Sequence, residues 1–218
     1  MKIEMHTHTS EGSACAFDPA IKIVEAYAKT EAKGIVITNH YSKNTYERFK
    51  DDLKNNYLKG YHEAQSVSKQ YGITIFLGME LNLIHNANDY LIYGIDEDFI
   101  ERYPLIFSVS LSELKEIVHK ENCLLIQAHP LRKECVLVET QYVDGYELNY
   151  TKFHDNHNDK LICWLKSIQE TNSSIIVTYG SDCHGVLSVA GALMEFEEDI
   201  HSNSELVEAI RQNTIDDL

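Results

Sequence analysis

The stretch GIVITNH, residues 34–40, decides the fold because it joins a buried strand to a potential metal ligand. Its run Ile35–Thr38 follows a glycine and consists of β-branched residues. Continuous runs of this kind are typical of strands that are covered on both faces. The run ends at Asn39 and His40, so an imidazole follows directly on the predicted strand.

Similar runs recur along the chain, and segments with helical spacing of apolar residues separate them. The predicted strands lie at residues 1–5, 35–38, 73–77, 90–95, 123–126, 143–148 and 175–178. The predicted helices lie within residues 18–34, 53–71, 114–118 and 161–168, with Asp18 as N-cap and Pro19 at the first helical position of the first. This alternation predicts an α/β fold with a largely parallel sheet. Six or seven strands suit a small, incomplete barrel better than an eight-fold one, which typically needs about 250 residues.

The composition predicts a single soluble domain over residues 1–218. Hydrophobic residues make up 44% and charged residues 24% of the 218, and no repeat or linker divides them. The formal net charge of −15 argues against long nucleic acid as a partner, because such a surface needs a basic footprint. Residues 1–5 do not begin a signal peptide, and no apolar run approaches a membrane span.

The cysteines predict a reducing compartment. There are five of them, at positions 15, 123, 135, 163 and 183, and no pair has CxxC spacing. An odd number without metal-type or redox-type spacing is typical of free thiols. We therefore expect a cytoplasmic protein.

Potential metal ligands stand at the ends of the predicted strands. In parallel α/β folds the carboxyl ends of the strands point to one rim, where active sites form. Residues far apart in the sequence are therefore expected to converge there. The candidates are His6, His8, His40, Glu80, His129, Asp182 and His184, with Asp89 at the start of the strand at 90–95.

The spacing of two pairs supports this hypothesis. Residues i and i+2 of a strand face the same side, so His6 and His8 can present two imidazoles to one ion. Asp182 and His184 can do the same. Imidazole with carboxylate suits zinc, manganese, iron or nickel. The carboxylate of Glu80 can bridge two ions, which makes a multinuclear centre plausible.

Each residue also has a simpler interpretation. Taken alone, His129 fits a hydrogen-bonded interior histidine and Asp182 fits a helix cap. His154 and His157 lie in a polar loop, where either solvent or the mouth of a site could surround them. The joint placement of the candidates at strand ends is what favours a metal centre.

Together these residues resemble the PHP (polymerase and histidinol phosphatase) family. The matching pieces are HTHTSEG at 6–12, TNH at 38–40, GME at 78–80, AHP at 128–130 and SDCHG at 181–185. Each piece is short, but their ordered set spans nearly the whole chain. The resemblance implies a distorted seven-stranded (β/α) barrel, two or three bound metal ions and hydrolysis of phosphoesters.

The resemblance also implies a distribution of ligands. His6 and His8 would bind one ion together with Glu80 and Asp182. His40 and His184 would hold a second ion. Glu80 would bridge to a third, which His129 also binds.

Three positions depart from the family pattern. Glu11 stands where the family often has Asp or His, and its longer side chain could still reach an ion. Asn39 stands where Asp is common, and could orient His40 from behind. Asp89 stands where many members have a histidine ligand, and its oxygen would shift selectivity toward manganese or iron or leave the third site weak.

The ions would supply the chemistry. A metal lowers the pKa of bound water from 15.7 to roughly 7, which provides a metal-bound hydroxide at neutral pH. Arg132 follows His129 and Pro130 at the rim. It is the candidate catalytic residue that grips phosphate oxygens, and a solvated surface arginine is the alternative.

We expect a zinc-, manganese- or iron-dependent phosphoesterase that acts on a small phosphorylated metabolite or nucleotide. One alternative is a metal hydrolase of the amidohydrolase type, which also begins with HxH on a barrel. The other is a non-catalytic PHP module that binds a partner. The substitutions at Glu11 and Asp89 keep this last alternative open.

Overall fold

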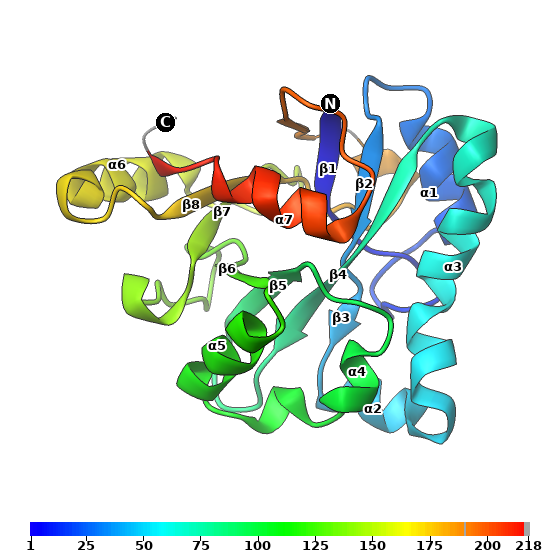
Figure 1. Ribbon diagram of the computed structural model, residues 1–218, viewed down its shortest axis with the longest axis horizontal. Coiled ribbons are helices and arrows are strands. Elements are labelled where there is room, and N and C mark those ends of the chain that lie inside the picture. The colour runs from blue at the N-terminus through cyan, green and yellow to red at the C-terminus, as the bar shows by residue number, and fades with distance from the viewer. Residues whose placement is uncertain (190, 216–218) are drawn as a thin grey trace.

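The structure, a computed structural model, describes residues 1–189 and 191–215 and consists of a curved sheet surrounded by helices (Figure 1). The strands are β1 (Lys2–Thr7), β2 (Gly34–Ile37), β3 (His40–Tyr41), β4 (Thr74–Asn82), β5 (Asp89–Tyr93), β6 (Leu124–Gln127), β7 (Gly145–Asn149), β8 (Ile176–Gly180) and β9 (Met194–Glu195). The α-helices are α1 (Ala20–Tyr27), α2 (Lys43–Phe49), α3 (Leu53–Tyr71), α4 (Phe99–Arg102), α5 (Leu111–Lys120), α6 (Asn158–Ile168) and α7 (Asn203–Arg211).

Seven strands of four or more residues form the sheet within the described ranges, in the order β8-β7-β6-β5-β4-β2-β1. The two-residue strands β9 and β3 pair with β1 and β4. The sheet closes near its carboxyl end, where His8 N donates to Cys183 O over 2.8 Å and Cys183 N donates to His6 O over 2.9 Å. The predicted distorted seven-stranded α/β barrel is therefore confirmed.

One strand runs against the others. β5 pairs antiparallel with both β4 and β6, whereas the remaining long strands pair in parallel. The turn between Asn82 and Asp89 is too short for a crossover helix, which a parallel neighbour would need. The start of β5 therefore lies at the same rim as the carboxyl ends of the other strands.

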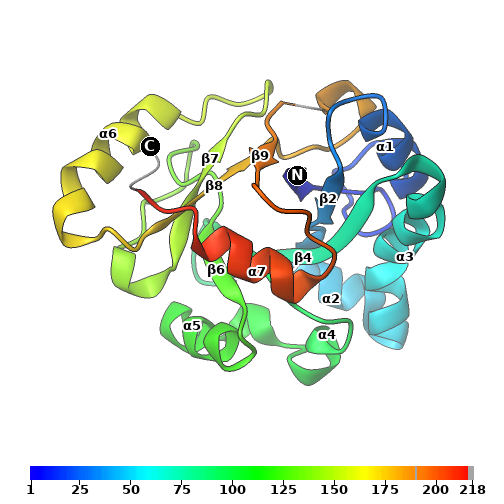
Figure 2. The same cartoon turned by 45° about the horizontal axis from the view of Figure 1, so that its top comes forward.

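Two apolar layers hold the barrel together. The outer layer packs buried residues of α1, α3, α5 and α6 against the sheet. The inner layer fills the amino end of the barrel, where Leu206, Val207 and Ile210 of α7 pack with Ile3 and Phe76. Figures 1 and 2 show α7 lying across the strands in both views. One end of the barrel is thus closed by apolar packing, and the other is left for polar groups.

The predicted helices at 53–71 and 161–168 match α3 and α6, and Gly72 ends α3 in the left-handed conformation with φ of 64°. The predicted N-cap Asp18 was wrong. Pro19 occupies the N-cap of α1, and the Asp18 carboxylate instead accepts from Val186 N over 3.0 Å. Both oxygens of Glu11 accept from Ala20 N, so this carboxylate covers the start of α1. None of the helices in the described ranges has the length and apolarity that a membrane crossing requires.

We predict that Ile210→Ala lowers the free energy of unfolding by about 2–5 kcal/mol. The substitution leaves a cavity in the apolar plug, by which we mean the packing of α7 against the amino end of the barrel. Urea denaturation measures this. Glu208→Ala on the same helix, with a side chain 75% exposed, is the control and should change it by less than about 0.5 kcal/mol. Equal effects of the two substitutions would contradict the role given to α7.

Candidate metal centre

The strand ends bring the predicted ligands to one rim. His6 and His8 come from the end of β1, and Asp182 and His184 follow β8. His40 begins β3, Glu80 lies near the end of β4, and His129 follows β6. Asp89 reaches the same rim because it begins the antiparallel strand β5.

Local distortions of the backbone aim some of these side chains. Between Glu4 and Thr7, β1 advances by three residues while β2 advances by two, from Ile35 to Ile37. Bulges of this kind re-aim side chains beside functional sites. His129 and Asp182 adopt positive φ values of 31° and 50°. Strained φ values of this kind cost on the order of 1–3 kcal/mol and persist only where the surroundings enforce them.

The first group consists of His6, His8, Glu80 and Asp182, all buried. The Nε2 atoms of the two histidines lie 3.1 Å apart. His6 Nε2 lies 3.2 Å from Glu80 Oε2 and 3.4 Å from Asp182 Oδ1. His8 Nε2 lies 3.1 and 3.2 Å from the same two oxygens.

Hydrogen bonds behind the rings fix the orientation of both imidazoles. His6 Nδ1 donates to Glu147 Oε1 over 2.8 Å. His8 Nδ1 lies 3.0 Å from Ser13 Oγ, which already accepts from His40 N and donates to Asn39 Oδ1. The single hydroxyl proton of Ser13 is thus used, so His8 Nδ1 is the donor. Both Nε2 atoms are then left with lone pairs that face each other, as in metal-ligating histidines.

This arrangement fits a divalent cation. Zn–N distances of about 2.0–2.1 Å place the ligands of a tetrahedral ion roughly 3.3 Å apart. The five separations given above range from 3.1 to 3.4 Å. Within the part of the chain that the structure describes, the buried Glu80 Oε2 has no hydrogen-bond partner. A bound cation would satisfy it and would separate the facing lone pairs.

Two further groups adjoin the first. His8, His40 and His184 bring three imidazoles together, and His40 Nδ1 lies 3.0 Å from Glu80 Oε2. Glu80, Asp89 and His129 form the third group, in which His129 Nε2 lies 3.0 Å from Glu80 Oε1 and 3.9 Å from Asp89 Oδ2. The two oxygens of Glu80 thus face different groups, as a bridging carboxylate requires.

Opposite charges stabilise one another in this cluster. Burial alone would raise the pKa of the Glu80 carboxyl, but His6 and His40 hold it well below its usual range. Burial likewise opposes ionisation of Asp182, and the neighbouring His6 holds its pKa well below the usual range. For Asp89, burial and the adjacent Glu80 carboxylate raise the pKa to about 6. The histidine nitrogens beside these carboxylates can bind either a proton or a metal ion, so protonation and metal binding compete there.

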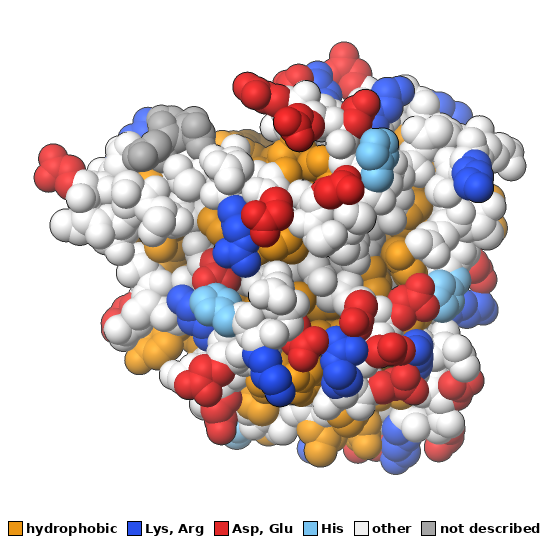
Figure 3. Space-filling view, in the orientation of Figure 1, with side chains coloured by type: hydrophobic (Ala, Val, Ile, Leu, Met, Phe, Trp, Pro, Cys, Tyr) orange, Lys and Arg blue, Asp and Glu red, His pale blue; other side chains and the backbone are white. Residues whose placement is uncertain are grey.

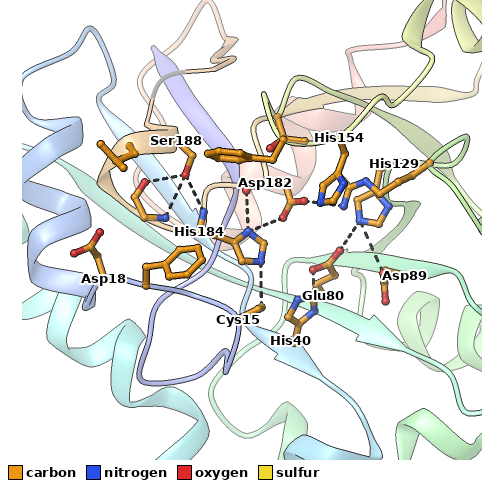
Figure 4. A pocket seen from close by; sticks show the side chains of 16 residues that line it. Cys15, Asp18, His40, Glu80, Asp89, His129, His154, Asp182, His184 and Ser188 are labelled. Carbon is orange, nitrogen blue, oxygen red and sulfur yellow. Dashed lines mark hydrogen bonds and ion pairs between the residues drawn. The ribbon is translucent and has the colours of Figure 1, made fainter.

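A cavity of about 740 Å³ opens onto these groups (Figure 4). His40, Glu80, Asp89, His129, Asp182 and His184 line it, together with Arg132 and the loop residue His154. Three apolar side chains of its lining are exposed to solvent: Phe17 (83%), Phe153 (64%) and Leu187 (88%). The cavity thus combines a polar, ligand-rich wall with an apolar rim.

Arg132 lies in this wall with partners on all three guanidinium nitrogens. Its NH1 atom lies 2.9 Å from Asp182 Oδ2, on the oxygen that the histidines leave free. Its Nε donates to Asn156 Oδ1 over 2.9 Å, and its NH2 donates to Asn149 Oδ1 over 3.3 Å. Arg132 is therefore part of the cavity and supports Asp182.

The structure does not bring Glu11 to the cluster, since its carboxylate covers the start of α1. The sequence analysis missed three residues behind or beside the ligands: Ser13, Cys15 and Glu147. The carboxylate of Glu147 supports His6 and also accepts from His129 N over 3.0 Å. A signal for Glu147 was present, because it is a carboxylate within the apolar strand β7.

Comparisons with known proteins agree with this geometry. Residues 171–215, which include β8 and α7, match the family described as PHP-associated. The chain is 29% identical over 108 residues to a PolC-type DNA polymerase III of Clostridium perfringens. This match covers 50% of the chain but only 6% of the polymerase, so the chain corresponds to a small part of that protein.

Solved structures show the same architecture over nearly the whole chain. A two-domain protein of Bacteroides vulgatus, described as containing a predicted PHP-like metal-dependent phosphoesterase, superposes with a TM-score of 0.68. Its sequence identity is 13%, and the match covers 98% of this chain and 63% of that one. The chain has the PHP fold. The fold that the resemblance implied is thereby confirmed.

A second solved structure, of a Bifidobacterium adolescentis protein described as a metal-dependent phosphoesterase, gives a TM-score of 0.58 at 14% identity. The match covers 97% of this chain and 96% of that one. The three groups described above contain ligands that are able to hold a metal ion, while the metal and the number of filled sites stay predictions.

We predict that Glu147→Gln weakens metal binding by about 10–100-fold, because His6 loses the carboxylate that orients its ring. Competition with a chelating dye measures the affinity. Glu170→Gln, at an exposed position, is the control and should bind metal as the wild type does. Unchanged affinity in Glu147→Gln would show that His6 needs no such support.

Proposed function

We propose that the protein is a metal-dependent phosphoesterase that acts on a small phosphorylated metabolite or nucleotide. The observation that carries this proposal is Glu80, whose two oxygens face separate groups of imidazole and carboxylate ligands at an open cavity. Two or three divalent ions, zinc, manganese or iron, suit these ligands. When bound, such ions lower the pKa of water and offset the charge of the phosphate.

The protein's own residues supply position and selectivity. Arg132 holds Asp182 in place, and three of its five N–H groups are used by the contacts described above. The remaining two are available to phosphate oxygens at the cavity wall. Arginine suits this task because its planar fork matches phosphate geometry.

The rim supports a substrate with an apolar or aromatic part. Phe17, Phe153 and Leu187 surround the cavity and expose most of their side chains. A sugar phosphate alone would leave these surfaces in water. A phosphate ester of an aromatic or nucleoside alcohol would cover them, which favours such esters among small substrates.

A small substrate also agrees with the charge of the protein. The net charge is −15, and on the face shown in Figure 3 the lysine and arginine side chains are interspersed with aspartate and glutamate. Long nucleic acid would meet repulsion over such a surface. The cytoplasm is the location that we propose, in keeping with five free thiols.

We predict that His8→Ala and Asp182→Ala each lower hydrolysis of p-nitrophenyl phosphate and of bis-p-nitrophenyl phosphate by more than about 100-fold. Both residues belong to the first group, and loss of a ligand costs more than loss of an outer support. Assays with zinc, manganese and iron, together with metal analysis, measure this. His62→Ala, an exposed histidine of α3, is the control and should keep full activity.

The same assays separate the alternatives. Bound metal without hydrolysis of either ester would favour an amidohydrolase-type reaction, which amide substrates would then reveal. Absence of bound metal under every loading condition would overturn the enzyme hypothesis. It would favour a non-catalytic module that binds a partner.

For Arg132 we predict that replacement by lysine raises KM about tenfold and lowers kcat less. A lysine keeps the charge but loses the fork that contacts both Asp182 and the phosphate. Steady-state kinetics with p-nitrophenyl phosphate measure both constants, and Arg102→Lys, on the distant helix α4, is the control. Unchanged kinetics in Arg132→Lys would leave Arg132 without a role at the phosphate.

A further inference from the structure

Cys15 lies in the wall of the cavity, on the side of the second group of imidazoles (Figure 4). Its Sγ lies 3.1 Å from His184 Nε2, and His40 lines the same cavity. The rings of His40 and His184 flank His8, with centroid separations of 4.4 and 4.3 Å from it. The thiol thus contacts one ring of a group of three imidazoles.

The ring of His184 is oriented in the same way as those of the first group. Its Nδ1 donates to the backbone carbonyl of Asp182 over 2.9 Å, and a carbonyl oxygen can only accept. His184 Nε2 therefore carries a lone pair, and this lone pair faces Cys15 Sγ. A nitrogen lone pair and a sulfur atom that converge in this way form a pair of donors for a cation.

We propose that Cys15 is a thiolate ligand of the ion held by His40 and His184. A set of imidazole nitrogens and one sulfur selects zinc, or the similar ions cobalt and iron, over manganese and magnesium. Zn–S distances of about 2.3 Å and Zn–N distances of about 2.0–2.1 Å place such donors roughly 3.1–3.6 Å apart for angles of about 90–110°. The observed separation of 3.1 Å lies at the lower end of this range.

The loop that carries Cys15 is held on both sides. Before it, Ser13 Oγ contacts His8 Nδ1 and accepts from His40 N over 2.9 Å. After it, Phe17 N donates to His184 O over 2.7 Å. Cys15 is therefore positioned by the same segments that carry the histidines, as a preorganised ligand would be.

Two other thiols serve as comparisons. Cys135 Sγ lies 4.0 Å from His129 Nδ1, on the opposite side of that ring from Glu80, which contacts Nε2. Cys163 is exposed on α6. The position of Cys15 beside an Nε2 lone pair is different from both.

The inference rests on the metal centre of the proposed function, and cobalt loading tests the two separately. We expect cobalt-loaded wild type to show a thiolate-to-cobalt charge-transfer band in the near ultraviolet. Cys15→Ser should lose it, whereas Cys135→Ser and Cys163→Ser should keep it. Cys15→Ser should also bind zinc about tenfold more weakly while its manganese affinity changes less.

A second measurement on the wild type covers the case in which Cys15→Ser does not fold. Zinc should slow the alkylation of Cys15 by iodoacetamide, followed by peptide mass spectrometry, relative to Cys163 in the same sample. Bound cobalt without the band, or zinc without protection, would overturn the role of Cys15 and leave the metal-dependent phosphoesterase standing. Failure of every metal to bind would overturn both.

Discussion

The carboxylate of Glu80 is the group on which the site depends. It is fully buried, and an isolated carboxylate in that position would be strongly destabilising. Imidazoles from three separate segments approach its two oxygens. They are those of His6 and His8 at the end of β1, His40 at β3 and His129 after β6. These segments meet only because the sheet curves enough for the end of β1 to bond with Cys183 beyond β8. The barrel is therefore the means by which one buried charge receives its partners.

The two ends of the barrel have different roles: the amino end stabilises the fold, and the carboxyl end carries the candidate ligands. At the amino end, α7 covers the interior with apolar side chains that need no polar partner. At the carboxyl end, two features destabilise the folded chain. They are the positive φ values of His129 and Asp182 and the burial of several charged side chains. A well-packed plug at one end offsets these costs at the other. The match of residues 171–215 to a PHP-associated family covers this plug.

The sequence predicted what depends on neighbouring residues. Apolar runs that end in a histidine or a carboxylate located the strands and placed seven candidate ligands at one rim, because in a parallel sheet strand direction determines which end a residue occupies. The direction of β5 depends on a short hairpin, and its pattern is that of any buried strand. The roles of Ser13, Cys15 and Glu147 depend on contacts between segments up to 169 residues apart, which no local pattern contains. Glu11 shows the converse, since its motif position suggested a ligand while its carboxylate bonds the start of α1.

The groups behind the ligands explain how so many imidazoles can serve one centre. Glu147, Ser13 and the carbonyl of Asp182 each bond to an Nδ1 atom, and each thereby leaves an Nε2 lone pair directed inward. Converging lone pairs and carboxylates repel one another unless cations lie between them. An anionic phosphate would meet the same repulsion from a chain of net charge −15. Cations at this cluster, with Arg132 beside them, would remove both problems, because the charge that stabilises the ligands would also attract an anion to the cavity.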